Sequence, residues 1–157
     1  MRKDRISTST TESKPAGRQQ WLDLAQIASV EFTSEDPAFP VDSCFSEDGP
    51  GWRSANPGTQ TIRLLFDQPR PVRRILLEFV ETESERAQEF MLAWASERSG
   101  PFKEIVRQQW NFSPQGSTKE VEDYQVNLDG VSALELIIKP SLDGVHGLAK
   151  LARWRVA

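Results

Sequence analysis

The sequence predicts an all-β fold, an antiparallel β-sandwich or barrel, and three observations support this. About eight short segments carry apolar residues at alternating positions, as half-buried strands do. Clusters of Gly, Pro, Ser and Asp separate these segments at intervals of roughly 8 to 15 residues. No alternation of strand and helix is visible, which argues against a parallel βαβ architecture.

The N-terminal part of the predicted domain holds one strand and two ambiguous segments. Residues 19–27 are too short for periodicity to distinguish a helix from an edge strand. Residues 28–33 alternate, which predicts a strand, and the prolines that follow it cannot lie in a central strand. We expect a helical turn at 41–45 and a Trp-bearing loop at 51–58.

The middle of the chain carries the clearest strand signal. Residues 59–66 place Ile62, Leu64 and Phe66 on one face. The Pro-containing segment 67–71 predicts a turn, and residues 72–80 predict the next strand.

The remaining segments complete the sandwich. We expect long loops at 110–116 and 141–147. The expected strands are 88–96, 102–108, a less regular 121–128, 132–139 and a closing strand at 148–156.

Composition restricts the class of protein. The chain has 157 residues, which suits one domain, and a net charge of −4, which makes nucleic acid an unlikely partner. No apolar run is long enough to span a membrane, and no apolar leader follows the N-terminus. The single cysteine, Cys44, cannot form an internal disulfide, so we expect a cytoplasmic protein.

Two regions are expected along the chain. Residues 1–18 are polar and rich in Ser and Thr, with five basic and two acidic side chains, which predicts a disordered tail. Residues 19–157 then form the β-sandwich domain.

The order of several motifs resembles that of discoidin domains, the coagulation-factor C-type modules of the galactose-binding-domain-like group. The resemblance covers about residues 28–157 and depends on segment order, since no single motif is highly specific. The motifs that carry it are the strand 28–34, Gly51-Trp52-Arg53, the strands 59–66 and 71–77, the hairpin 90–105, and the last strands 131–138 and 148–156. Residues 33–36 and 52–55 also resemble the N-terminal domain of a single-strand-break repair scaffold.

The resemblance implies a jelly-roll β-sandwich that binds a ligand through loops at one end and is not an enzyme. Family members that bind structural calcium place a glutamate in the final strand. Here that position falls at or near Arg153, a cation, so we expect no metal and no cofactor. The resemblance also implies that Trp52 is a core residue.

Six residues in the expected loops are candidates for ligand binding. Sugars need aromatic faces and planar hydrogen-bonding groups, and the loops supply both. The candidates are Arg53, Asn56, Trp110, Asn111, Phe112 and His146. For Trp110 to Phe112, capping the end of the barrel is an equally good interpretation.

The first functional hypothesis is therefore a non-catalytic carbohydrate-binding module. The alternative is a protein-interaction or scaffold domain, as the local likeness to the repair scaffold suggests. A weaker alternative is an enzyme built on His146, the only histidine, although no nucleophile motif accompanies it. The ligand and the oligomeric state are left open.

Overall fold

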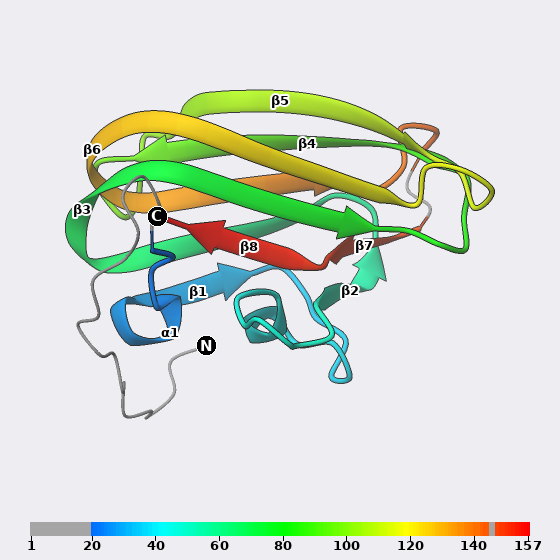
Figure 1. Cartoon of the computed structure of the whole chain (residues 1–157), viewed down its shortest axis with the longest axis horizontal. Helices are drawn as coiled ribbons and strands as arrows, with labels where there is room; N and C mark the ends of the chain where they lie inside the picture. The colour runs from blue at the N-terminus through cyan, green and yellow to red at the C-terminus, as the bar shows by residue number, and fades with distance from the viewer. Residues whose placement is uncertain (1–19, 145–146) are drawn as a thin grey trace.

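The computed structural model describes residues 20–144 and 147–157, and it is an all-β structure (Figure 1). The predicted tail at 1–18 lies outside the described residues. The elements in chain order are α1 (Leu24–Ile27), β1 (Ala28–Phe32), η1 (Val41–Cys44), β2 (Trp52–Pro57), β3 (Gln60–Val80), β4 (Arg86–Ala95), β5 (Lys103–Phe112), β6 (Lys119–Lys139), β7 (Leu148–Leu151) and β8 (Arg153–Val156).

Two long antiparallel strands, β3 and β6, connect the two layers of the sandwich. Their pairing runs from Gln60 opposite Ile138 to Val80 opposite Lys119. In one layer the strand order is β1-β3-β6-β4-β5. In the other layer, β8 pairs with the second half of β3. The short strands β2 and β7 form a separate two-stranded sheet.

The predicted turn at 67–71 is wrong, because β3 continues through it. The pairing with β6 shifts register three times between Leu65 and Arg74, so the ladder is already interrupted there. Pro69 and Pro71 lie within this interruption, where a missing backbone N–H costs no ladder hydrogen bond. The prolines mark the place where the strand passes from one layer to the other.

The core lies between the layers and confirms the predicted apolar faces. Ile62, Leu64 and Phe66 are at most 1% exposed. Trp52 is also 1% exposed, as the resemblance implied for a core residue. Each such side chain contributes about 1.5–3 kcal/mol through burial. Among the described residues, no helix is long and apolar enough to cross a membrane.

The expected loop at 51–58 is largely a strand. Trp52 pairs with Leu151 and Arg53 with Lys150, which forms the β2–β7 sheet. Gly51 has φ of +90°, and a Cβ there would lie 2.9 Å from the carbonyl oxygen of Leu151. A glycine is therefore needed where the chain enters β2.

Candidate functional site

Four connections meet at one end of the sandwich, which we call the loop end: residues 58–59, 81–85, 113–118 and 140–147, of which 145–146 are not described. Backbone hydrogen bonds join them in two pairs and tie the connection 140–147 to the start of β4. The N–H of Glu81 donates to Thr118 over 2.8 Å, and that of Leu142 donates to Ala87 over 2.9 Å. Gly58 donates to Gly147 over 3.4 Å. The connections thus form one surface, at the right in Figure 1.

A buried ion network lies beneath the loop end. Glu81 is 2% exposed, and its carboxylate lies 2.7 Å from the guanidinium of Arg86 and 3.1 Å from the ammonium of Lys150. Arg86 also donates to the carbonyl of Leu148 over 2.9 Å. The network therefore ties the β3–β4 connection to the start of β7.

The charges in this network compensate one another. Burial alone would raise the pKa of Glu81, but the backbone N–H of Glu83 and the cations Arg86 and Lys150 hold that pKa below its ordinary value. Burial lowers the pKa of Arg86, and Glu81 opposes that effect. The carboxylate is charged at neutral pH, and the pair acts as a rigid support for the loop end.

Two predicted site residues lie on β2. Asn56 is exposed near the end of the strand, and its carbonyl accepts hydrogen bonds from Ser54 and Gln60. Arg53 is half-buried, with its guanidinium carbon 4.0 Å from the ring centroid of Phe39. It helps to line a shallow hollow of about 250 Å³ together with Lys150.

The other described site residues, Trp110, Asn111 and Phe112, lie at the end of β5 and not in the expected loop. Strand alternation places Asn111 on the outer face, where it is exposed, and turns its two neighbours inward. Phe112 is 1% exposed, and Trp110 is half-buried against the core. Trp110 and Asn111 therefore do not form one patch. The sixth candidate, His146, lies outside the described residues.

No group of three or more His, Cys, Asp or Glu within the described part of the chain could hold a metal ion. The guanidinium of Arg153 donates to the carbonyl of Gly49 over 2.7 Å and to that of Ala152 over 2.6 Å. The carbonyl oxygens of Gly49 and Ala152 are thus hydrogen-bonded to the cationic side chain of Arg153. Cys44 is fully buried, and burial raises the pKa of its thiol, which leaves it a poor nucleophile.

A second polar region, which the sequence did not reveal, lies between the layers. We call it the inter-sheet cluster: Gln88, Trp110, Glu120, Glu122 and Tyr124. Eight buried side-chain atoms in the described residues have no hydrogen-bond partner, and five belong to this cluster. They are Gln88 Nε2, Trp110 Nε1, both carboxyl oxygens of Glu120 and the Tyr124 hydroxyl.

Local strand geometry explains why these residues meet. Glu120, Glu122 and Tyr124 occupy alternate inward positions on β6, and Gln88 pairs with Trp110 across β4 and β5. Burial and the neighbouring carboxyl of Glu122 raise the pKa of Glu120 to about 9, and the amide of Gln88 opposes this. Burial and both carboxyls also raise the pKa of Tyr124. The alternation of residues 120, 122 and 124 on one face of a strand was the feature of the sequence that could have indicated this cluster.

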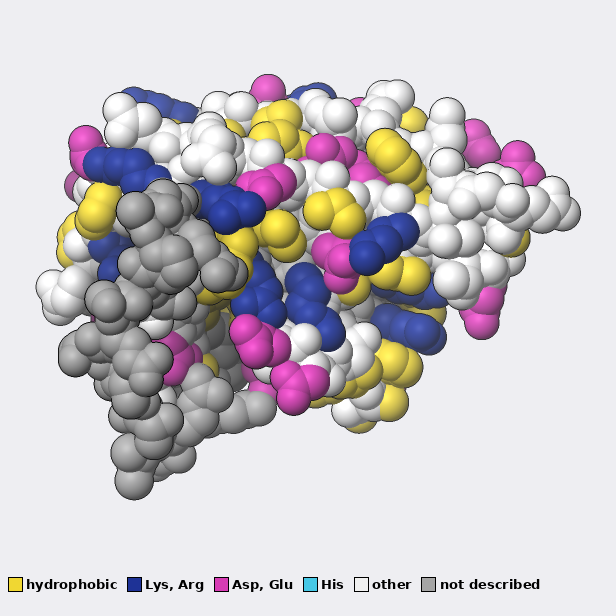
Figure 2. Space-filling view, viewed as in Figure 1, with side chains coloured by type: hydrophobic (Ala, Val, Ile, Leu, Met, Phe, Trp, Pro, Cys, Tyr) yellow, Lys and Arg dark blue, Asp and Glu magenta, His cyan; other side chains and the backbone are white. Residues whose placement is uncertain are grey.

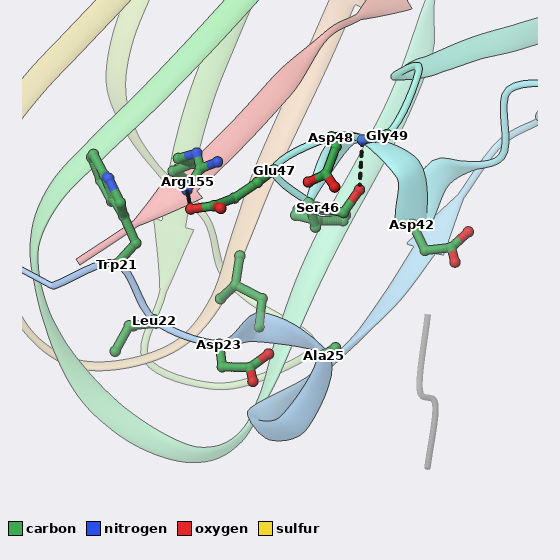
Figure 3. A pocket seen from close by; sticks show the side chains of 12 residues that line it. Trp21, Leu22, Asp23, Ala25, Asp42, Ser46, Glu47, Asp48, Gly49 and Arg155 are labelled. Carbon is green, nitrogen blue, oxygen red and sulfur yellow. Dashed lines mark hydrogen bonds and ion pairs between the residues drawn. The ribbon is translucent and has the colours of Figure 1, made fainter. Parts of the chain in front are cut away.

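A hollow of about 630 Å³ lies elsewhere, between the segment around α1 and the loop after η1 (Figure 3). Trp21 and Asp23 line one side, and Glu47 and Asp48 line the other. Arg155 closes it from β8 through an ion pair of 3.4 Å with Glu47. None of the five described candidate residues lines this hollow.

The face shown in Figure 2 carries positive and negative side chains next to each other, not one basic patch. Oppositely charged side chains of the described chain also form ion pairs, such as Arg74 with Asp123 at 2.6 Å and Lys119 with Glu78 at 2.9 Å. Exposed pairs of this kind contribute about 0–1 kcal/mol each. Because charges of both signs are mixed on this face, it offers no continuous basic surface to a nucleic-acid backbone.

Comparison with known proteins finds similarity in structure but not in sequence. No protein-family model matches the chain, and no curated protein matches it. Solved structures do match. A family 32 carbohydrate-binding module of AlyQ in complex with 4,5-unsaturated mannuronic acid has a TM-score of 0.64 and 14% identity, and the match covers 88% of this chain and 98% of that one.

Two further matches come from Clostridium perfringens. The family 32 module of NanJ in complex with galactose has a TM-score of 0.57 and 16% identity, covering 82% of this chain and 92% of that one. A module in complex with GalNAc-β-1,3-galactose has a TM-score of 0.64 and 15% identity, covering 87% and 99%. The chain therefore has the discoidin-like, galactose-binding-domain-like jelly-roll fold. This is the fold of family 32 carbohydrate-binding modules, and it confirms the prediction from the sequence.

Proposed function

We propose that this chain is a non-catalytic carbohydrate-binding module that holds its ligand at the loop end. The buried network of Glu81, Arg86 and Lys150 carries this proposal, because it fixes several connections as one preorganised surface. Proteins of the same fold are known in complex with galactose and with GalNAc-β-1,3-galactose, which supports a saccharide as the ligand class.

The exposed groups at the loop end suit a saccharide. Asn56 and Asn111 present amides that can pair with hydroxyl groups. Leu142 and Leu148, which are 40% and 38% exposed, offer apolar surface to the C–H face of a sugar ring. Arg53 can add a planar donor from the adjacent strand. Phe112 supports the surface from below, and His146 stays a candidate from the sequence.

Binding to a glycan array, followed by titration calorimetry with the best saccharide, tests this proposal. We expect Asn56→Ala and Asn111→Ala each to weaken binding about tenfold, as the loss of one or two good hydrogen bonds would. Asn127→Ala is the matched control, since Asn127 is exposed on β6 away from the loop end. Absence of any saccharide binding would refute the proposal.

A protein partner is the alternative, and the unpaired side of β5 is the edge that it would use. Among the described residues β5 pairs only with β4. Lys103, Glu104 and Arg107 on this strand are exposed, and charged side chains discourage strand addition at an edge. The structure therefore favours the saccharide. Recovery of one stoichiometric protein partner, with no glycan bound, would reverse that preference.

We also propose a cytoplasmic location, on the basis of the single buried cysteine. Fractionation of cells that express the tagged full chain tests it. Recovery in the cytoplasmic fraction supports the proposal, and recovery outside the cytoplasm refutes it.

A further inference from the structure

The inter-sheet cluster lies on an open side of the sandwich. The first half of β6, from Lys119 to Leu128, pairs only with β3 in the described chain, and β5 pairs only with β4. Both strands therefore leave one edge without a neighbour. In Figure 1 these strands run along the same long side of the molecule. The side chains that point inward beside these two edges include Trp110, Glu122 and Tyr124.

The cluster has a half-exposed rim and a buried floor. Trp110, Glu122 and Tyr124 are half-buried and form the rim. Glu120 and Gln88 lie beneath it, each 1% exposed. The Gln88 amide lowers the pKa of Glu120 and Gln88 is the cross-strand neighbour of Trp110, so the amide points into the cluster. The buried indole N–H of Trp110 has no hydrogen-bond partner among the described residues. A buried donor without a partner is costly, and it indicates that a polar group belongs there.

Acceptors predominate among these groups. Glu120 and Glu122 supply four carboxyl oxygens, whereas Gln88 and Trp110 supply N–H donors and Tyr124 supplies one hydroxyl. No cation among the described residues pairs with either carboxyl. Trp110 and Tyr124 add aromatic rings, which attract cations to their faces. The cluster therefore lacks a positive charge that also carries hydrogen-bonding groups.

We propose that the inter-sheet cluster binds the protonated amino group of an amino sugar, a hexosamine with a free amine. The ammonium donates to Glu122 at the rim and neutralises the carboxyl pair. The ring hydroxyls accept from the donors of the cluster, and the aromatic rings pack against the C–H face of the sugar. This inference depends on the proposed function, because it names the class of saccharide.

The groups around Glu120 set the expected proton linkage. Its own strand contributes Glu122 and Tyr124. From β4 come Gln88 and, two positions along, Arg86, which is held by Glu81. Trp110 on β5 and Phe79 on β3 do not titrate. An ammonium group bound here stabilises the ionised form of Glu120, so binding should release a proton from its carboxyl.

The same argument excludes other saccharides from this position. An N-acetylated amine carries no charge and leaves the carboxyl pair uncompensated. A uronic acid brings a third carboxylate and is repelled. A ligand of the kind seen with the AlyQ module, an unsaturated mannuronic acid, would therefore bind poorly at the cluster.

Titration calorimetry of the full chain at pH 7.5 with glucosamine, N-acetylglucosamine, galactose and glucuronate tests the inference. We expect a Kd for glucosamine at least tenfold lower than those for N-acetylglucosamine and glucuronate. Glu122→Gln and Glu120→Gln should each erase this preference. Glu97→Gln, an exposed carboxyl in the β4–β5 turn, is the matched control and should keep it.

Two further readouts separate the cluster from the loop end. The indole N–H signal of Trp110, assigned with Trp110→Phe, should shift on titration with glucosamine. The binding enthalpy should depend on the ionisation enthalpy of the buffer in the wild type, and not in Glu120→Gln. If galactose binds but glucosamine shows no Glu122-dependent preference, the inference is wrong and the proposed function stands. If no saccharide binds, both are wrong.

Discussion

Two buried carboxyl groups in this molecule, Glu81 and Glu120, are almost equally buried and behave in opposite ways. They are 2% and 1% exposed. Burial favours the protonated form of both. Glu81 has two cations within 3.1 Å, and its pKa lies below the ordinary value. Glu120 faces a second carboxyl and no cation, and its pKa rises to about 9.

The comparison shows that the partner, and not the depth of burial, decides the charge state. Around Glu81 the chain supplies two cations, Arg86 and Lys150, which compensate the carboxylate. This network therefore supports the loop end. Around Glu120 the described chain supplies a second carboxyl, that of Glu122, and the amide of Gln88, but no cation. A ligand can add what is missing there, which is why the two regions have different proposed roles.

The largest expected effect comes from removing the charge of Glu81. Glu81→Gln leaves Arg86 buried without its carboxylate, so we expect the free energy of unfolding to fall by about 3–5 kcal/mol. Urea denaturation at pH 7 measures this. The double variant Glu81→Leu/Arg86→Met replaces the pair by apolar side chains and should recover most of the loss. A loss below about 1 kcal/mol in Glu81→Gln would mean that the network is not a support.

An intermediate effect is expected from the titration of Glu120. Because its folded-state pKa is raised, its contribution to stability is fully present below about pH 4.5, the ordinary value, and is lost as pH rises through about 9. The free energy of unfolding should therefore fall as the pH rises between these limits. Glu120→Gln should flatten this slope and be more stable than the wild type at pH 8.

Denaturation curves from pH 5 to pH 9 test this prediction. Glu97→Gln serves as the control and should follow the wild type. Parallel curves for the wild type and Glu120→Gln would show that Glu120 is ionised in the folded protein, and that the contrast with Glu81 does not hold.

The smallest effect is expected at the Tyr124 hydroxyl. The hydroxyl lies beside the carboxyls of Glu122 and Glu120, which together with burial raise its pKa, and it makes no well-formed hydrogen bond, so Tyr124→Phe removes a buried polar atom and loses at most a weak contact with Glu122. We expect the free energy of unfolding to change by less than about 1 kcal/mol, or to rise slightly. Thermal or urea denaturation measures it. A loss of about 2 kcal/mol or more would indicate a partner for the hydroxyl, and the cluster would then be satisfied within the chain.

The fold was predictable from the sequence because its signal is repeated. Alternation in segments such as 59–66 identified core residues that the structure buries, including Ile62 and Leu64. The continuity of β3 through residues 67–71 was not predictable, because prolines normally end a strand. Prolines are tolerated inside β3 only because the pairing with β6 shifts register there, and such shifts are a feature of the tertiary structure.

The candidate site was less predictable, because it depends on which face each residue takes. Asn56 and Asn111 are exposed as expected, whereas Trp110 and Phe112 turn inward once β5 extends to residue 112. Glu81 and Lys150 lie 69 positions apart in the sequence, and no local pattern indicates their pairing. The inward acids of β6 follow strand alternation, but nothing in the sequence shows that Gln88 faces them.

The most direct test of saccharide binding is a ¹⁵N–¹H correlation spectrum of the full chain titrated with galactose and with glucosamine. The proposed function predicts saturable shifts of loop-end amides, including those of Asn56 and Asn111, with the amides of β8 unchanged. Glucosamine should in addition shift the indole N–H of Trp110. Spectra that stay unchanged with both sugars at high concentration would contradict carbohydrate binding.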